Sequence, residues 1–373
     1  MIMRLCSGCG LKYAYSVDEC TVCRAAVAES EGGRDGEIVA ITEVAAPSLG
    51  HEDVPYWCAL VSLVDGGYAV VKRDIPAQVG DAVRLGVGKV ATPHHIGVVG
   101  SGVMATGLVE LFLARSQTVV WVARSLERLE RAKAKVDSRL VRIMDQEQLE
   151  AAQAMLTLSD DMASLAECDL VIEAVVEEVE PKLAVLRGIE QTVSSDCLVV
   201  TNTSSLPLDV LARGLGRPER FGGMHFFNPP MRMRLVEIIR APETSDEIDK
   251  RMFELSLSLG KIPVRVSNSP GFVVNRVLMP LLNEAVRTLE DGVAPAEDID
   301  EAIRLGLNHP MGPLALADLI GLDVVVNIMD DLHGRLGDKA YAPRPLLRQL
   351  VEDGKLGRKA GAGFYDYAPP SGS

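Results

Sequence analysis

A histidine and a glutamate twelve residues apart are the side chains of this sequence best suited to move a proton. His225 lies in the apolar stretch MHFFNP, and Glu237 follows in LVEII. If the second stretch returns as an adjacent strand, the carboxylate can hold one ring nitrogen and leave the other as a general base. A histidine on an apolar strand is by itself more often a core residue, so the surrounding motifs must decide.

A glycine-rich turn upstream predicts a dinucleotide site. The stretch HIGVVGSGVMATG passes from an apolar strand into a helical pattern. Gly100 permits the sharp bend, and Gly102 lets a pyrophosphate approach the amides at the start of the helix. The third fingerprint position is Ala105, which a known variant of the motif allows. We assign Gly100, Gly102, Met104 and Gly107 to the cofactor site; the alternative is a glycine-rich turn without a ligand.

The next apolar strand, VVWV, ends without the usual acidic residue. A carboxylate there binds the adenine ribose 2′-hydroxyl and repels a 2′-phosphate. Ala123 removes both effects, Arg124 can pair with a phosphate, and Ser125 can donate a further hydrogen bond. The pattern favours NADP, with NAD possible. Alternatively, Ser125 caps the following helix and Arg124 is a surface charge, and both interpretations can hold together.

Two pairs of cysteines near the N-terminus predict a structural metal site. CSGC and CTVC are separated by ten residues and supply four thiolates, at Cys6, Cys9, Cys20 and Cys23. Four thiolates from two tight turns complete the closed tetrahedron of structural zinc. Two disulfides are the alternative, which a reducing cytoplasm disfavours. We therefore expect a zinc ribbon over residues 1–30.

Short alternating strands follow the cysteines and predict a small β-barrel over residues 36–91. Asp65-Gly66-Gly67 provides a hairpin turn between two of them. A zinc ribbon followed by such a barrel resembles the zinc-ribbon/OB-fold modules found with acyl-CoA-processing enzymes. OB-folds often bind nucleic acid through aromatic side chains on a basic groove. This segment is acidic and poor in aromatics, so we expect an acyl-chain or protein-docking role and no nucleic acid.

Six motifs, taken together and in order, resemble the 3-hydroxyacyl-CoA dehydrogenases, including the short-chain 3-hydroxybutyryl-CoA enzymes. The resemblance covers roughly His94 to Tyr367. It rests on these stretches: DLVIEAVVEEVEPK, VVTNTSSL, GGMHFFNPPMRMRLVEII, SPGFVVNR, NHPMGPLALADLIGLD and LGRKAGAGFYDY. The resemblance implies a Rossmann α/β domain at 94–268 and an all-α domain at 269–373 that closes the cleft and forms a homodimer.

The family's catalytic groups carry over to four residues of this chain. Its base matches His225, and the carboxylate that orients the base matches Glu237. The serine that bonds the oxygen on the reacting carbon matches Ser204. An asparagine that contacts the reacting end of the substrate matches Asn275. Without the resemblance, Ser204 would be interpreted as a turn residue and Asn275 as a residue at the start of a helix.

Three further residues are implied on the cofactor side. Glu177 and Lys182 match family positions near the nicotinamide ribose, and Asn202 lies beside it. The predicted activity is interconversion of 3-hydroxyacyl and 3-oxoacyl thioesters with NAD(P), His225 acting as general acid and base.

The sequence departs from the family pattern at three places. One is Ala123. Another is the segment after Asn228, where Pro230, Met231 and Arg232 replace apolar residues and the nearby pocket is expected to differ. The last is a shortened helical arm at residues 129–156, where Lys133, Lys135, Arg139 and Arg142 are either phosphate partners or a solvated face. A shorter grip on CoA raises an alternative substrate, an acyl-carrier-protein thioester of polyketide extender-unit synthesis.

Length and composition set the wider expectations. A chain of 373 residues is too long for one ordinary domain, and a net charge of −14 disfavours a nucleic-acid backbone as partner. No apolar run is long enough to span a membrane and no signal peptide is present, so we expect a cytoplasmic protein. Two rival hypotheses remain: the N-terminal ninety residues are the working part on an inert scaffold, or the substrate is a free sugar acid.

Overall fold

The chain divides into two units, Met1–Thr92 and Pro93–Ser373. The computed structural model describes residues 95–367 with their side chains and, before them, strands as backbone only. These strands form two antiparallel sheets, ordered β2-β1-β3 and β6-β5-β4-β7. Their bounds are β1 (Met3–Cys6), β2 (Lys12–Tyr13), β3 (Val27–Ser30), β4 (Arg34–Val44), β5 (Tyr56–Leu63), β6 (Tyr68–Arg73) and β7 (Ala82–Leu85).

The predicted zinc ribbon and OB-like barrel lie in the first unit. The side chains of Cys6, Cys9, Cys20 and Cys23 fall outside the described residues, as do the segments that would close a barrel. Both features therefore stay predictions. Among the residues whose side chains are described, no group of histidine, cysteine or acidic residues is arranged to hold a metal ion.

One eight-stranded sheet organises the first part of the second unit, in the order β10-β9-β8-β11-β12-β13-β14-β15. Neighbouring strands are parallel except β13 and β14, which are antiparallel. The central strands are apolar because both sheet faces are covered. Their bounds are β8 (His95–Val99), β9 (Thr118–Val122), β10 (Leu156–Ser159), β11 (Leu170–Glu173), β12 (Leu198–Thr201), β13 (Phe221–Phe226), β14 (Leu235–Arg240) and β15 (Ile262–Val266).

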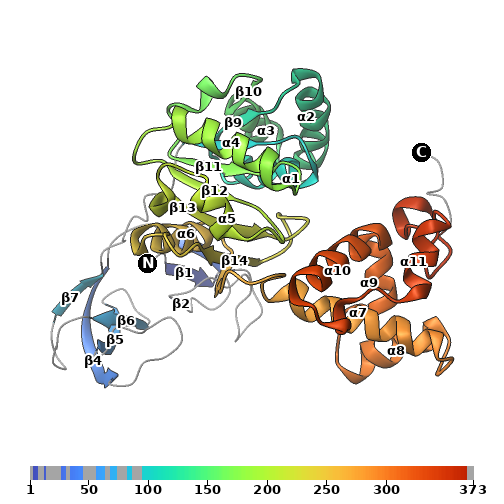
Figure 1. The fold of residues 1–373 in the computed structure, drawn as a ribbon. Coiled ribbons are helices and arrows are strands. Elements are labelled where there is room, and N and C mark those ends of the chain that lie inside the picture. The colour runs from blue at the N-terminus through green and yellow to red at the C-terminus, as the bar shows by residue number, and fades with distance from the viewer. Residues whose placement is uncertain are drawn as a thin grey trace. The chain divides into compact units, whose positions relative to one another are not determined.

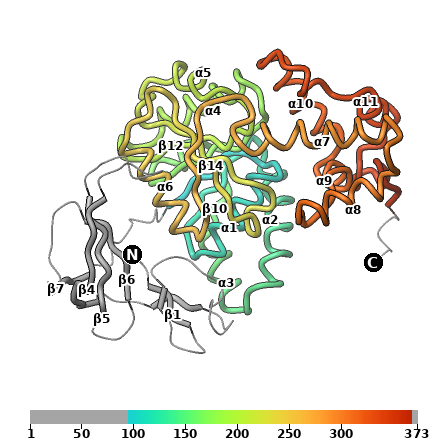
Figure 2. The backbone as a smooth tube through the Cα atoms, turned by 90° about the horizontal axis from the view of Figure 1, so that it is seen from below, coloured from blue at the N-terminus to red at the C-terminus, as the bar shows by residue number. Residues whose placement is uncertain are grey.

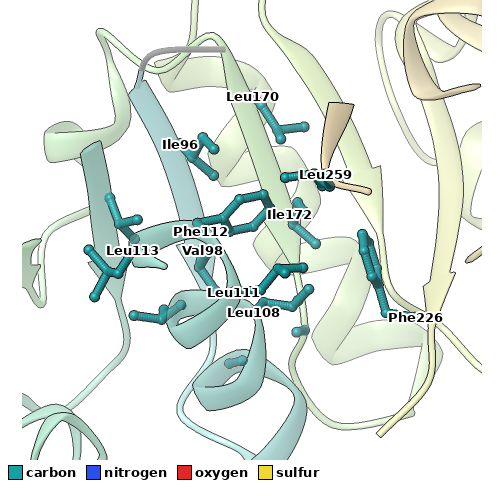
Figure 3. Packing of buried hydrophobic residues seen from close by; sticks show 14 of the residues in the cluster. Ile96, Val98, Leu108, Leu111, Phe112, Leu113, Leu170, Ile172, Phe226 and Leu259 are labelled. Atoms are coloured by element: carbon teal, nitrogen blue, oxygen red, sulfur yellow. The ribbon is translucent and has the colours of Figure 1, made fainter. Parts of the chain in front are cut away.

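Helices cover both faces of this sheet (Figure 2). On one face lie α1 (Val103–Leu113), α2 (Leu126–Leu140), α3 (Gln146–Ala154) and α6 (Asp246–Ser258), and on the other α4 (Val179–Thr192) and α5 (Leu208–Arg213). Figure 3 shows Leu108, Leu111 and Phe112 of α1 packed toward Val98 of β8 and Ile172 of β11. The arrangement confirms the predicted Rossmann-type α/β domain.

A group of helices follows β15 and confirms the predicted all-α domain (orange to red in Figure 1). It has its own core, which includes Met279, Leu314 and Met329. Its helices are α7 (Val274–Glu290), α8 (Ala296–Gly306), α9 (Pro313–Ile320), α10 (Leu322–Leu336) and α11 (Pro345–Glu352). Short 3₁₀ turns occur at Met162–Leu165, Pro218–Arg220, Lys339–Tyr341 and Arg358–Ala360. No helix in the part of the chain that the structure describes is long and apolar enough to cross a bilayer.

Candidate active site

The histidine and the glutamate meet across an antiparallel strand pair. His225 of β13 lies directly opposite Glu237 of β14 in the register, so their side chains project from the same face. Nδ1 of His225 is 2.7 Å from Oε2 of Glu237. The two residues are 5% and 1% exposed. The predicted pair is therefore formed, in surroundings where water competes little for the hydrogen bond.

The second oxygen of Glu237 is held at the start of a helix. Oε1 accepts hydrogen bonds from the backbone N–H groups of Val273 and Val274, each at 3.0 Å. These amides begin α7, where the helix dipole favours a negative charge. An ionised Glu237 keeps the ring proton on Nδ1 of His225, which leaves Nε2 as the basic nitrogen. The rings of Phe227 and Phe272 pack around the imidazole, with centroids at 4.5 and 5.7 Å.

A carboxylate shapes the loop that carries Ser204. Oε1 of Glu177 accepts hydrogen bonds from the backbone N–H of Ser204 at 2.6 Å, from that of Ser205 at 2.9 Å and from the Thr203 hydroxyl at 2.6 Å. Burial acts to raise the pKa of Glu177, but the Lys182 ammonium and these hydrogen bonds outweigh it and lower the pKa. Glu177 is thus an anionic anchor for the loop after β12. The Ser204 hydroxyl makes no hydrogen bond within residues 95–367.

Lys182 lies beneath this loop and is only 1% exposed. Its ammonium is 2.8 and 3.1 Å from the two oxygens of Glu173 and 3.2 Å from Oε2 of Glu177. The Thr201 hydroxyl donates to Glu173 as well, at 2.6 Å. Glu173 was not assigned a role from the sequence, although a carboxylate inside the apolar strand DLVIEA was a usable signal. Buried charges of this kind need such partners.

The two asparagines assigned from the sequence differ in their hydrogen bonds. Oδ1 of Asn202 accepts from the backbone N–H of Phe226 at 2.9 Å, so its side chain joins the end of β12 to the strand of His225. Asn275 lies at the second position of α7 and is half-buried. Within the described residues its side chain makes no hydrogen bond, which leaves its amide available to a ligand.

The glycine-rich turn joins β8 to α1 as predicted. Gly100 has φ +130°, and a Cβ there would lie 2.3 Å from the carbonyl oxygen of Ala174. Gly102 is the N-cap of α1, and a Cβ there would meet no atom within 4 Å. The open space in front of a helix N-terminus fits a pyrophosphate group. Gly107 has a packing role, because a Cβ there would lie 2.6 Å from Cδ of Pro230. Met104 is half-buried against the core.

The residues proposed to contact the adenine ribose or its 2′-phosphate follow the end of β9. Ser125 is the N-cap of α2, and its hydroxyl accepts from the backbone N–H of Arg128 at 3.3 Å. The capping role is therefore real, and it does not exclude a ligand. Arg124 is exposed, and no ion pair or hydrogen bond of its side chain exists among residues 95–367. Ala123 packs against the core.

The shortened arm is formed by α2 and α3. Two of its four candidate cations are engaged: Lys133 with Asp137 at 2.6 Å, and Arg139 with Glu110 at 3.0 Å. Lys135 and Arg142 are exposed and have no ion pair within the described part of the chain.

The site residues gather after the carboxyl ends of the parallel strands. The glycine turn follows β8, Glu177 follows β11, Ser204 follows β12, and His225 is near the end of β13. Ligands of open α/β sheets bind at this edge. The arrangement therefore places a dinucleotide turn and a histidine–carboxylate pair at one edge of one sheet.

Comparison with known proteins agrees with this geometry. Residues 95–269 match the family described as 3-hydroxyacyl-CoA dehydrogenase, NAD binding domain, and residues 271–367 match the corresponding C-terminal domain. A probable 3-hydroxybutyryl-CoA dehydrogenase of Deinococcus radiodurans is 43% identical over 275 residues, covering 73% of this chain and 99% of that protein. A 3-hydroxybutyryl-CoA dehydrogenase of Clostridioides difficile is 43% identical over 277 residues, with the same coverage.

A solved structure shows the same architecture. The (S)-3-hydroxybutyryl-CoA dehydrogenase PaaH1 from Ralstonia eutropha is similar with a TM-score of 0.71 and 41% identity. The similarity covers 74% of this chain and 100% of that one. Neither family match includes the N-terminal unit.

Proposed function

This chain belongs to the 3-hydroxyacyl-CoA dehydrogenase family, and from that premise we propose that it interconverts 3-hydroxyacyl and 3-oxoacyl thioesters. The observation that carries the proposal is the buried contact of 2.7 Å between Nδ1 of His225 and Oε2 of Glu237. It lies at the same sheet edge as the dinucleotide turn. An inert scaffold would not need this pair together with Ser204 and Asn275.

The role of His225 follows from its contact with Glu237, and the roles of Ser204 and Asn275 follow from the resemblance to the family. A bound nicotinamide dinucleotide supplies the hydride acceptor for oxidation and the hydride donor for reduction. In oxidation, Nε2 of His225 takes the proton of the substrate hydroxyl, and Glu237 stabilises the resulting imidazolium. In reduction, the imidazolium returns that proton to the forming alcohol. The Ser204 hydroxyl and the Asn275 amide bond the oxygen of the reacting carbon.

The substrate proposed is a short-chain acyl-CoA, in keeping with the names of the relatives. Lys135 and Arg142 of the arm are the cations available to CoA phosphates. Turnover of 3-hydroxybutyryl-CoA is followed by absorbance of the reduced nicotinamide and compared with the same acyl group on a carrier protein. Higher kcat/KM for the CoA thioester is expected. Turnover of the carrier-protein form alone would overturn the CoA assignment, and turnover of neither would overturn the dehydrogenase.

For the cofactor, NADP is the finer proposal. The family shows a nicotinamide dinucleotide site, and the second strand of this chain ends in Ala123-Arg124-Ser125. The support is the exposed Arg124 guanidinium, which has no protein partner within residues 95–367. A guanidinium binds a phosphate dianion in forked geometry.

For the N-terminal unit, the proposal is a zinc ion held by Cys6, Cys9, Cys20 and Cys23. Its support is the spacing of two Cys-x-x-Cys turns. Metal analysis of the full chain is expected to give one zinc per chain, and none after substitution of Cys20 and Cys23 by serine. Absence of zinc from the unmodified chain would reject the site.

The helical domain is proposed to form a homodimer. The support is the resemblance to the family and the presence of large apolar residues on the surface of this domain. These residues are Val277, Val293, Leu305, Leu307 and Leu319. Light scattering on the eluted full chain is expected to give twice the chain mass; a monomer at micromolar concentration would contradict the proposal.

A further inference from the structure

The backbone of Gly100, where the chain leaves β8 for α1, makes two hydrogen bonds to β9. Its N–H donates to the carbonyl oxygen of Val122 at 2.9 Å. Its carbonyl oxygen accepts from the indole Nε1–H of Trp121 at 2.6 Å. Trp121 is 0% exposed and is the largest fully buried side chain in the described part of the chain. A side chain of the sheet core therefore reaches the turn of the dinucleotide site.

The backbone conformation at Gly100 determines the direction of the first N–H groups of α1. Gly100 has φ +130°, and Gly102, two residues later, begins the helix. The amides that follow are those expected to face a pyrophosphate. A buried carbonyl that loses its donor carries a desolvation cost, so the turn would be expected to shift toward another donor. A shift at Gly100 would move the first amides of α1.

A phenylalanine would keep an aromatic side chain at position 121 of the core, but it could not donate a hydrogen bond. The indole of tryptophan is a donor and never an acceptor, which suits a carbonyl oxygen. We propose that Trp121 is a positioning residue of the dinucleotide site: its indole N–H fixes the Gly100 peptide and thereby orients the amides at the start of α1. The proposal rests on dinucleotide binding by this domain, and it depends neither on the thioester nor on the choice between NAD and NADP.

The variant Trp121→Phe keeps an aromatic ring in the core and removes the N–H donor together with part of the ring volume. We expect the Kd and KM for NAD and for NADP to rise by the same factor, about 5–20-fold, from the loss of one buried hydrogen bond. The kcat at saturating cofactor and the KM for the acyl thioester should change less than about twofold on the same reasoning. A role in packing alone would lower thermal stability without changing cofactor affinity.

A matched control is Phe221→Leu. Phe221 is a buried aromatic at the start of β13, at the sheet edge opposite the ligand edge. This variant is expected to lower the melting temperature and to leave cofactor affinity unchanged. Unchanged affinity in a folded Trp121→Phe protein would overturn the role of Trp121. Failure of the unmodified chain to bind either dinucleotide would instead reject the proposed function, and the role of Trp121 with it.

A second measurement tests the proposal even if Trp121→Phe does not fold. The chain has two tryptophans, Trp57 and Trp121. In full-length protein labelled with ¹⁵N-tryptophan, Trp57→Phe assigns the two indole signals. The Trp121 N–H is expected to be protected from hydrogen exchange and to shift when NAD is added. A rapidly exchanging signal, or one that does not move at saturating NAD, would overturn the proposal.

Discussion

The proposed choice of NADP over NAD depends on three consecutive residues at the end of β9. Ala123 supplies no carboxylate to repel a 2′-phosphate, and Arg124 supplies an exposed guanidinium. Ser125 is already used as the N-cap of α2, but a hydroxyl that accepts from a backbone amide still has its own proton to donate. The local structure of these residues thus serves the helix and remains compatible with a phosphate ligand.

Arg124→Ala is expected to lower kcat/KM for NADP by about 10–100-fold, because a charge-assisted hydrogen bond is lost. The value for NAD should stay within about twofold because NAD carries no 2′-phosphate. Steady-state kinetics with both cofactors gives the ratio. Arg131→Ala is the control, since Arg131 lies on α2, the helix that follows Arg124, and its guanidinium is 3.6 Å from Glu127. A wild-type preference for NAD, unchanged by Arg124→Ala, would contradict the assignment.

At the scale of elements, the loop after β12 depends on Glu177. Its Oε1 accepts hydrogen bonds from the backbone N–H groups of Ser204 and Ser205 and from the hydroxyl of Thr203. Glu177→Ala removes this acceptor and is expected to lower kcat by about 10-fold or more, because Ser204 loses its fixed position. Glu177→Gln keeps an oxygen acceptor and should lower kcat by a smaller factor. Stopped-flow turnover at saturating cofactor measures both variants; equal kcat for wild type and Glu177→Ala would exclude an anchoring role.

The segment between β13 and β14 contacts a buried lysine. Nζ of Lys261, which is 5% exposed, donates to the carbonyl oxygens of Pro230 and Met233. Pro230 in turn packs against Gly107 of α1. Burial, and then the nearby Arg115 guanidinium, lower the pKa of Lys261 from 10.5 to about 8. The link between β13 and β14 thus connects the strands of His225 and Glu237 to α1.

The lowered pKa of Lys261 makes the free energy of unfolding depend on pH. Between about pH 8 and 10.5, Lys261 keeps its proton in the unfolded chain and releases it in the folded protein. The free energy of unfolding contributed by Lys261 therefore rises with pH across that window. Urea unfolding gives the free energy of unfolding of the wild type and of Lys261→Met at several pH values. The value for the wild type minus that for Lys261→Met is expected to rise from pH 8 to 10. A difference that is constant or falls would contradict the lowered pKa.

Motifs in the sequence predicted the histidine pair, the glycine turn and the order of an α/β and a helical domain. These features depend on local spacing. The structure contains the His225–Glu237 contact and the glycine turn, and the family comparison confirms the two domains. The contacts of Glu173 and of Trp121 were not foreseen, because each depends on which strands become neighbours in the sheet. Lys261 likewise meets Pro230 only through the pairing of β14 with β15. Sequence spacing carries no information about such long-range partners.

At the scale of the whole molecule, every proposed catalytic and cofactor residue lies between residues 95 and 367. A truncated chain that begins at Ala91 is therefore expected to keep kcat/KM within about threefold of the full chain, since no group that stabilises the transition state is lost. Zinc chelation of the full chain should have an equally small effect. The same assay with 3-hydroxybutyryl-CoA tests both. Loss of all turnover on truncation would show that the N-terminal unit is essential.

The most direct test of the account is the turnover of His225→Gln beside that of the wild type. Oxidation of 3-hydroxybutyryl-CoA, followed at the absorbance of the reduced nicotinamide, is expected to fall by about 10²–10⁴-fold in kcat when the general base is lost. Cofactor affinity should be unchanged, because His225 contacts Glu237 and not the glycine turn. A His225→Gln protein that turns over at the wild-type rate would contradict the proposed chemistry.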